Sequence, residues 1–244
     1  MYPNPYRRET LVQQLTAVPA WDLIVIGGGA TGLGVALDGL SRGYRTLLLE
    51  QADFAKGTSS RSTKLVHGGV RYLAQGQIAL VREALRERGY LAQNARHLVH
   101  DQRFIIPCYR WWEKPLYRIG LGLYDLMAGA LRFGKTRCIS RDELLALAPN
   151  TKAEGLRGGV TYHDGRFDDA RLAIELARTA LDHGACVVNH MPVTALLKDG
   201  TGSVIGVQVR DGLSGNTFKV RGKAIVNATG VFTNEVMAMD GPDE

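Results

Sequence analysis

The segment "DLIVIGGGATGLGVALD" (22–38) joins a short apolar run to a helix-forming run through a cluster of glycines. The apolar run predicts a buried strand at about 22–27, and the small and apolar residues from 30 to 40 predict a tightly packed helix. A second apolar run, "RTLLLE" (45–50), predicts another buried strand. This strand–helix–strand unit, with a right-handed crossover, is typical of a Rossmann-like α/β domain.

Three glycines in this segment follow the GxGxxG spacing of dinucleotide-binding turns. Gly27 permits a tight turn, Gly29 lets the backbone approach a pyrophosphate, and Gly32 allows the helix to pack closely on the strand. The free N–H groups near Ala30, at the start of the helix, would face the phosphates. Glu50 ends the second strand, where its carboxylate can accept a ribose hydroxyl and disfavours the 2′-phosphate of NADP.

The order of the later elements favours FAD over NAD. A regular NAD domain would continue with alternating strands and helices, but here residues 51–184 separate the second strand from a third, "ACVVN". Three alternating segments within 193–222, joined by Gly, Asp and Ser turns, then predict an antiparallel meander. A fourth buried strand, "AIVNATG" (224–230), follows. Such insertions are typical of flavoproteins.

The loop "GTSSRSTKLVHGGVRYL" (57–73) concentrates hydroxyls, glycines and cations. Lys64 offers a point charge, His67 precedes two glycines that allow close backbone approach, and Arg71 presents a fork suited to a phosphate group. Tyr72 can donate a hydrogen bond beside it. The alternative is a solvated surface loop, but its position after a dinucleotide motif favours a site for phosphate or flavin polar atoms.

Composition sets broader bounds. The chain has 244 residues, with 45% apolar and 22% charged residues, which excludes a disordered, collagen-like or disulfide-rich protein. A net charge of +6 suits an anionic ligand or an anionic membrane surface. The positive charge is spread along the chain without a nucleic-acid-binding motif, so no nucleic-acid partner is expected. The three cysteines form no CxxC pair, so we expect reduced thiols, a reducing compartment and no metal site.

Four motifs together resemble the FAD-dependent glycerol-3-phosphate dehydrogenases. They are "DLIVIGGGATGLGVALD", the loop 57–73, "YHDGRFDDARL" (162–172) and "IVNATG" (225–230). The resemblance covers about residues 20–240 and implies an α/β fold. The implied fold comprises a Rossmann-like FAD-binding domain of the glutathione-reductase type, with a parallel sheet and an antiparallel β-meander, plus part of a substrate domain. The implied division is an N-terminal arm (1–20), an FAD-binding domain (21–95 and 155–244, incomplete at its C-terminus) and an inserted segment facing substrate or membrane (96–154).

The resemblance also assigns individual residues. It implies that Arg71 and Tyr72 contact the substrate. His67 is a candidate for the catalytic base, and packing within the flavin loop is the alternative role for it. One departure is Val231, where the family has proline after "NATG". The residues implied to bind FAD are Gly27, Gly28, Gly29, Gly32, Glu50, Thr58, Ser59, Lys64, Leu65, His67, Gly68, Gly69, Val193, Ala228, Thr229 and Gly230.

The implied activity is oxidation of sn-glycerol 3-phosphate to dihydroxyacetone phosphate, with the electrons passed to quinone. The resemblance implies peripheral attachment to an anionic membrane surface, on the cytoplasmic side of the cell membrane, or a cytoplasmic location. A predicted helix at 115–133, flanked by basic and aromatic residues, suits the interface, and a buried helix of the substrate domain is the alternative.

Two alternatives to this activity stay open. The glycine motif equally suits another FAD-dependent oxidase of amines or amino acids. Because family members are longer than this chain, we also expect residues 1–244 to be an N-terminal fragment, which could bind FAD without turnover.

Overall fold

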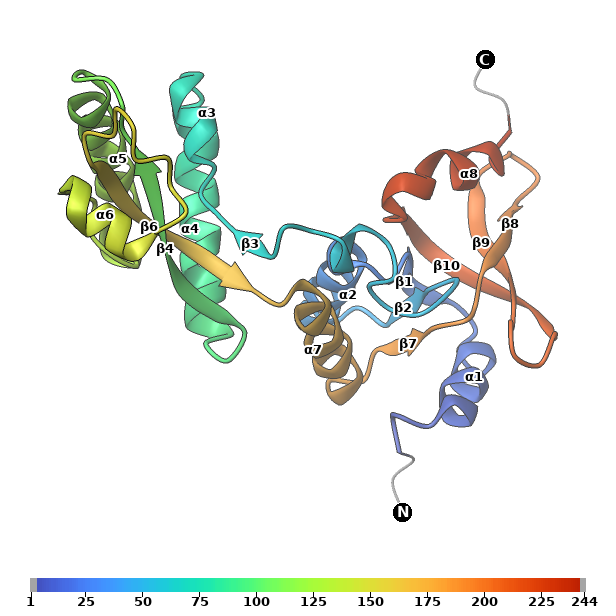
Figure 1. Cartoon of the computed structure of the whole chain (residues 1–244). Coiled ribbons are helices and arrows are strands. Elements are labelled where there is room, and N and C mark those ends of the chain that lie inside the picture. Colours follow the sequence, from blue (N-terminus) through green and yellow to red (C-terminus); the bar gives the residue numbers. More distant parts are fainter. Residues whose placement is uncertain (1–3, 242–244) are drawn as a thin grey trace. The chain divides into compact units, whose positions relative to one another are not determined.

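The computed structural model describes residues 4–241, which form two compact units (Figure 1). The first unit comprises the described residues up to Ser62 and those from Asp169 onward. The second unit is Thr63–Asp168. Each unit has its own sheet and its own buried clusters.

These boundaries differ from the expected ones at 95/96 and 154/155. Residues 63–95 and 155–168 belong to the second unit rather than to the dinucleotide-binding unit. The reason is strand pairing and helix packing, since β3 (Leu65–Val66) pairs with β6 (Gly159–Phe167), and α4 (Ile78–Asn94) packs against α5 (Glu113–Ala128).

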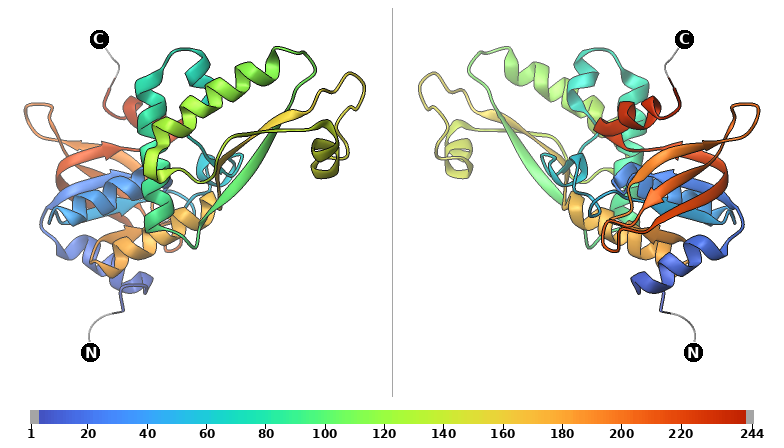
Figure 2. Two further views of the ribbon diagram at one scale, coloured as in Figure 1. Left: turned by 90° about the vertical axis from the view of Figure 1, so that its left-hand side faces the viewer. Right: turned by 90° about the vertical axis from the view of Figure 1, so that its right-hand side faces the viewer.

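A six-stranded sheet organises the first unit, in the order β7-β2-β1-β10-β9-β8. The pairs β1–β2, β2–β7 and β1–β10 are parallel, whereas β10–β9 and β9–β8 are antiparallel, which confirms the expected parallel sheet with a meander. The meander is the orange-to-red ladder in Figure 2. The strands are β1 (Trp21–Ile26), β2 (Thr46–Leu49), β7 (Cys186–Val188), β8 (Val193–Lys198), β9 (Val204–Arg210) and β10 (Thr217–Asn227).

One expected division of the sheet is wrong. The third meander strand and "AIVNATG" are a single strand, β10. Residues 217–221 pair with β9, and Gly222 begins the pairing with β1. No turn separates the two halves. A side chain at position 222 would collide with Ile24, whereas glycine lets the strand continue close beside β1.

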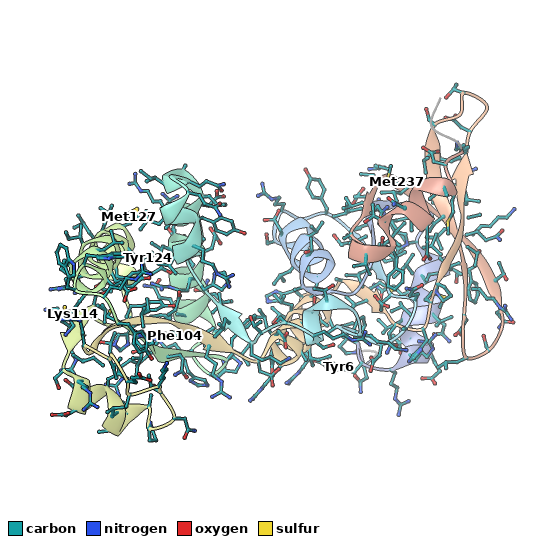
Figure 3. All side chains as sticks on the ribbon, turned by 45° about the horizontal axis from the view of Figure 1, so that its top comes forward. Tyr6, Phe104, Lys114, Tyr124, Met127 and Met237 are labelled. Carbon is teal, nitrogen blue, oxygen red and sulfur yellow. The ribbon has the colours of Figure 1, made fainter. Side chains whose placement is uncertain are left out.

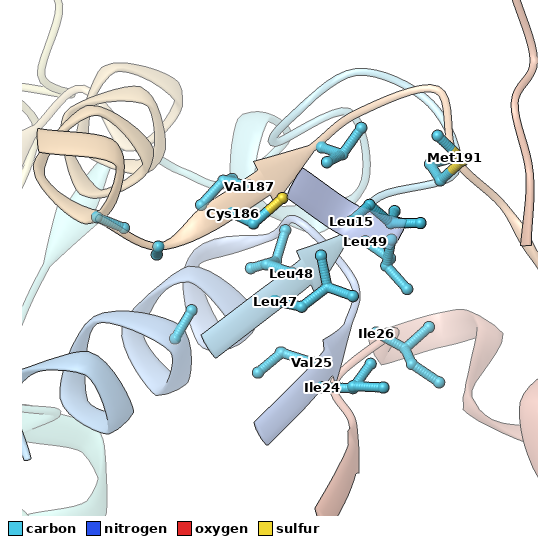
Figure 4. Packing of buried hydrophobic residues seen from close by; sticks show 14 of the residues in the cluster. Leu15, Ile24, Val25, Ile26, Leu47, Leu48, Leu49, Cys186, Val187 and Met191 are labelled. Atoms are coloured by element: carbon cyan, nitrogen blue, oxygen red, sulfur yellow. The ribbon is translucent and has the colours of Figure 1, made fainter. Parts of the chain in front are cut away.

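The core of the first unit lies around β1, β2 and β7 (Figure 4). All four residues of β2 are buried, as the run "TLLL" requires of a strand covered on both faces. The helix α1 contacts β7 and β10, and α2 contacts β1, β2 and α7. The remaining elements are α1 (Arg8–Ala17), α2 (Ala30–Ser41), η1 (Thr58–Ser60), α7 (Asp169–Asp182), η3 (Gly230–Phe232) and α8 (Thr233–Ala238).

The second unit is built on an antiparallel sheet in which β6 pairs with β3, β4 and β5. Ser140 caps the N-terminus of α6 (Arg141–Leu147), since its Oγ accepts a hydrogen bond of 3.1 Å from Glu143 N. The elements not yet given are α3 (Val70–Ala74), β4 (Val99–Pro107), η2 (Gly129–Leu131) and β5 (Arg137–Ile139).

Helix α5 carries an apolar face that is exposed in the second unit. It ends at Ala128 rather than 133, where Gly129 with φ +53° begins the short turn η2. Tyr124 and Met127 lie on its packed side (Figure 3). Exposed apolar residues recur at helical spacing from the N-cap of this helix onward and are Trp112, Leu116, Ile119, Leu123 and Leu126. None of the helices within residues 4–241 has the length and apolar character to cross a membrane.

Candidate cofactor and substrate site

The glycine turn after β1 has no room for a side chain at Gly27, Gly28 or Gly32. Gly27 adopts φ +115° and donates its N–H to Leu49 O at 2.8 Å. A Cβ at Gly27 would lie 2.5 Å from Ala228 O, and a Cβ at Gly32 would overlap the carbonyl oxygen of Gly27. The turn is therefore held between β1, β2 and the end of β10, and it needs glycine for both its conformation and its packing.

This turn directs the N-terminus of α2 outward. Gly29 is the N-cap and has no capping side chain of its own. Ser59 supplies one from η1, since its Oγ accepts the Ala30 N–H at 2.9 Å. If Gly29 carried a Cβ, its nearest neighbour among the described atoms would be the same Ser59 Oγ, at 3.2 Å. The Ala30 N–H is thus occupied, whereas the Ser59 hydroxyl hydrogen and the following first-turn N–H groups are donors suited to pyrophosphate oxygens. Gly29 has no side chain to block their approach, so this turn fits the ADP half of FAD.

Glu50 is oriented by two backbone donors. Its Oε2 accepts from Gly28 N at 2.6 Å and its Oε1 from Ala52 N at 2.8 Å. Each carboxylate oxygen keeps a further lone pair for a ribose hydroxyl. The acid that directly follows β2 is therefore hydrogen-bonded to the glycine turn.

The end of β10 lies beside the glycine turn. Ala228 donates its N–H to Ile26 O at 2.8 Å, and the Thr229 hydroxyl donates to Asn227 Oδ1 at 2.7 Å. Asn227 also donates from Nδ2 to Thr233 O at 3.1 Å, so it ties the "NATG" turn to α8. The sequence reasoning missed Asn227, although an amide directly before a glycine turn is a recognisable turn residue.

The other predicted cofactor residues of the first unit occupy less constrained positions. Val193 begins β8, two residues after Met191, whose N–H bonds to Glu50 O at 2.8 Å. Gly230 has φ +60° and begins η3, and Thr58 begins η1. Among the first unit's predicted residues, the glycine turn, Glu50, Ser59 and Ala228 are joined by direct contacts.

The remaining predicted residues lie in the second unit. Lys64, with φ +60°, leads into β3, and its carbonyl accepts the Phe167 N–H at 3.0 Å. Leu65 pairs with Arg166 on β6. His67 is exposed at the end of this strand, next to Gly68 and Gly69, which are buried.

Gly69 begins the short helix that presents the predicted substrate residues. It adopts φ +72° and accepts the Tyr72 N–H at 2.8 Å. Arg71 and Tyr72 on α3 are both exposed. Burial and then the charge of Asp164 raise the pKa of Tyr162, and the Arg71 guanidinium opposes that rise. Tyr162 therefore belongs to the surroundings of Arg71, a neighbour that the sequence reasoning did not name.

A buried ion pair between Arg88 and Asp164 holds the backbone of Gly68. Arg88 Nη1 and Asp164 Oδ1 are 2.8 Å apart, and the two side chains are only 1% and 3% exposed. Asp164 Oδ1 also accepts from Gly68 N at 3.4 Å, and its Oδ2 accepts from the Tyr124 hydroxyl at 2.8 Å. Burial and the Asp164 charge raise the pKa of Tyr124, so this phenol stays protonated and acts as a donor.

The Arg88 guanidinium is enclosed by aromatic rings. It lies 4.6 Å from the Phe133 ring centroid and 5.9 Å from that of Tyr124. Its Nε has no hydrogen-bond partner among the described residues. The network thus fixes the Gly68 backbone at the entrance to α3, because moving that loop would unpair buried charges.

These features define the first unit as a dinucleotide-binding domain. The chain matches the family described as FAD dependent oxidoreductase over residues 22–244. It belongs to this family of FAD-dependent oxidoreductases.

Three comparisons place the chain more closely. It is 42% identical to the mitochondrial glycerol-3-phosphate dehydrogenase of Rattus norvegicus, over 98% of this chain and 35% of that protein. The structure of a glycerol-3-phosphate dehydrogenase from Bacillus halodurans complexed with FAD matches with a TM-score of 0.76 and 32% identity, over 98% of this chain and 40% of that one. L-proline dehydrogenase from P. horikoshii shares the fold, with a TM-score of 0.70 and 19% identity over 92% of this chain and 57% of that one. The chain spans about a third of the length of the curated relatives it matches.

The glycine turn gives a first prediction. Gly32→Ala is expected to weaken FAD binding at least tenfold and to destabilise the protein by about 1–3 kcal/mol, because its Cβ would overlap the Gly27 carbonyl oxygen. The matched control is Gly34→Ala in the same helix, where a Cβ meets nothing within 4 Å. Fluorescence titration with FAD and urea unfolding of both variants provide the test. Equal affinities for the two variants would contradict the role given to this turn.

Proposed function

We propose that this chain carries the cofactor-binding part, and part of the active site, of an enzyme that oxidises sn-glycerol 3-phosphate to dihydroxyacetone phosphate. The observation that carries the proposal is α3, where Gly69 starts a helix that presents Arg71 and Tyr72 to solvent. A guanidinium beside a phenol suits an anionic group such as a phosphate monoester and repels a cationic amine. The names of the relatives, which are 42% identical, support the same substrate.

The residues of this chain have separate tasks in that reaction. The glycine turn and Glu50 hold the ADP half of FAD in the first unit, and Thr58 and Ser59 continue that surface. Arg71 and Tyr72 orient the substrate phosphate. When bound, FAD supplies the acceptor for the hydride that leaves the substrate carbon.

His67 is the proposed base for the substrate hydroxyl. It is exposed beside two buried glycines, so its imidazole can meet a substrate held by Arg71 four residues further on. A neutral imidazole accepts the hydroxyl proton as the hydride departs, which balances the two-electron oxidation. The Lys64–Gly69 backbone then lines the path of the cofactor in the second unit.

A substrate screen separates this proposal from its alternative, a flavin oxidase of amines or amino acids. The intact protein should reduce an artificial electron acceptor with sn-glycerol 3-phosphate and not with glycine, proline or sarcosine. Glycerol without the phosphate serves as the matched control, because it keeps the reacting carbinol and removes the group that Arg71 binds. Turnover with an amine and none with glycerol 3-phosphate would contradict the proposal.

We further propose that electrons leave to quinone and that the second unit docks peripherally on an anionic membrane surface, at the cytoplasmic side of the cell membrane. The exposed apolar face of α5 supports this, since Ile119 and Leu126 are 74% and 75% exposed. Trp111 is equally exposed, and the Arg110 guanidinium lies 5.8 Å from the Trp112 ring centroid. An apolar helix face with tryptophans and cations at its end is typical of an interfacial helix.

The membrane proposal predicts a loss of vesicle binding when this face is charged. The double variant Ile119→Glu and Leu126→Glu should reduce sedimentation with phosphatidylglycerol-containing vesicles about tenfold or more, because two charges would enter the acyl boundary. Ile78→Glu with Leu80→Glu on α4 makes the same change at exposed apolar sites of the same unit. Equal binding by both double variants would contradict the placement on α5.

A further inference from the structure

The N-terminal arm is anchored in the core of the first unit. Leu11 and Leu15 of α1 are buried, and the Leu11 carbonyl accepts from the Cys186 thiol on β7 at 3.4 Å. The Leu15 carbonyl accepts the Trp21 indole N–H, also at 3.4 Å. The predicted arm is thus a packed helix, and nothing in the proposed reaction accounts for it.

Arg8, the first residue of α1, reaches the turn that follows β7. Its Nη1 donates to Asn189 O at 2.7 Å and to Asn189 Oδ1 at 3.3 Å, and its Nη2 lies 3.4 Å from His190 O. The same Nη2 pairs with Asp211 Oδ1 at 2.6 Å. One guanidinium therefore bridges two carbonyls of the 189–190 turn and a carboxylate, using the planar fork that lysine lacks.

Asp211 is a fixed partner for this cation. Its side chain is 7% exposed, and it accepts from Leu213 N at 3.0 Å and from the Ser214 hydroxyl at 2.9 Å. Burial alone would raise the pKa of Asp211, but the Leu213 N–H, the Arg8 guanidinium and the Ser214 hydroxyl lower it to about 2. The carboxylate is therefore charged at neutral pH and keeps Arg8 in place.

The turn that Arg8 holds is the partner of the loop that carries Glu50. Glu50 N donates to Val188 O at 2.9 Å, and Glu50 O accepts from Met191 N at 2.8 Å. His190, with φ +49°, donates to Ala52 O at 2.8 Å. Ala52 N in turn donates to Glu50 Oε1. Three consecutive hydrogen-bonded steps thus connect Arg8 to the carboxylate proposed to bind the ribose.

We propose that Arg8, paired with Asp211, is a positioning residue for Glu50 and thereby sets the affinity for the adenosine half of FAD. This proposal rests on the proposed cofactor site. The arm acts without touching the nucleotide. It holds the 189–191 turn against the Glu50–Ala52 loop, so that the carboxylate is already oriented when FAD arrives and little ordering remains to be done on binding.

A role confined to stability makes a different prediction. Loss of stability lowers the folded fraction but leaves the affinity of the folded protein unchanged well below the unfolding temperature. A positioning role lowers the affinity at temperatures where the variant is fully folded, and it also loosens the turn itself. Affinity and local hydrogen exchange therefore distinguish the two.

The test compares Arg8→Gln with Arg7→Gln, the same change at the preceding, exposed arginine. FAD binding is titrated by flavin fluorescence, 20 °C or more below each variant's melting temperature. We expect the dissociation constant to rise about tenfold for Arg8→Gln and to change less than about twofold for Arg7→Gln. Asp211→Asn should reproduce the Arg8→Gln effect, and Arg8→Lys should restore little of it because an ammonium lacks the fork.

Hydrogen exchange provides the second readout. The amides of His190 and Met191 should exchange faster in Arg8→Gln than in Arg7→Gln, while those of β1 stay unchanged. Equal affinities and equal exchange in the two arginine variants would overturn the proposal. If the unmodified protein fails to bind FAD, the proposed cofactor site fails instead, and the exchange rates still decide whether Arg8 holds the turn.

Discussion

Arg88→Met is expected to destabilise the second unit by about 3–5 kcal/mol, because it leaves the carboxylate of Asp164 buried without its charged partner. Methionine fills much of the volume between Tyr124 and Phe133, so lost packing contributes little of this effect. The same substitution should loosen Gly68, whose N–H shares the Asp164 oxygen with Arg88.

The control is Arg86→Met, two residues earlier on α4, where the side chain is exposed. Hydrogen exchange of the 63–168 segment in increasing urea reports the stability of this unit separately from that of the first. Arg86→Met should change it by less than about 0.5 kcal/mol. If both variants lose the same stability, the buried ion pair does not support the unit as we describe.

Arg71→Ala is expected to raise the Michaelis constant of the intact protein for glycerol 3-phosphate about 10- to 100-fold, while FAD stays bound. The reason is the loss of charge-assisted hydrogen bonds to the phosphate, each of which contributes to substrate binding. Steady-state kinetics and the flavin absorbance spectrum measure the two quantities. A matched control is Arg82→Ala, an exposed arginine on α4.

The phosphate itself provides a second check on Arg71. Inorganic phosphate should inhibit the unmodified protein competitively, and the inhibition should weaken in Arg71→Ala by a similar factor. An unchanged Michaelis constant in Arg71→Ala would remove this residue from the substrate site, whatever the result for Arg82→Ala.

Local sequence patterns predict the first unit well. The run "DLIVIGGG" and the helix after it encode β1, the turn and α2 within one short segment, so strand, turn and helix follow from neighbouring residues. The link between Glu50 and the glycine turn follows equally, because adjacent parallel strands end at the same edge of a sheet. Local patterns do not predict that the two expected strands merge into β10, because this depends on the close contact between Gly222 and Ile24 of β1.

The supports of the site could not be predicted in the same way. Arg88 and Asp164 are 76 residues apart, and Arg8 and Asp211 are 203 apart, so neither pair has a local signal. One indication was available, since Val81, Leu85 and Arg88 share one face of α4 and two of them are plainly core residues. A cation on an apolar helix face predicts a buried partner, but the sequence does not say which acid it is.

The division into units depends on long-range pairing as well. The 155–168 segment contains β6, whose sequence predicts a strand but not the unit to which it belongs. Its pairing with β3 and β4 places it in the second unit. The loop 57–73 is split by the boundary, so Thr58 and Ser59 belong to the first unit and Lys64 to Tyr72 to the second.

Hydrogen exchange of the protein with and without saturating FAD tests the central claim most directly. We predict added protection at the glycine turn (27–33), in the Glu50–Ala52 loop and across residues 57–69, with no change in α5 or α6. Protection that leaves residues 27–33 and Glu50 unaffected would contradict the claim that the α2 N-terminus and this acid hold the cofactor.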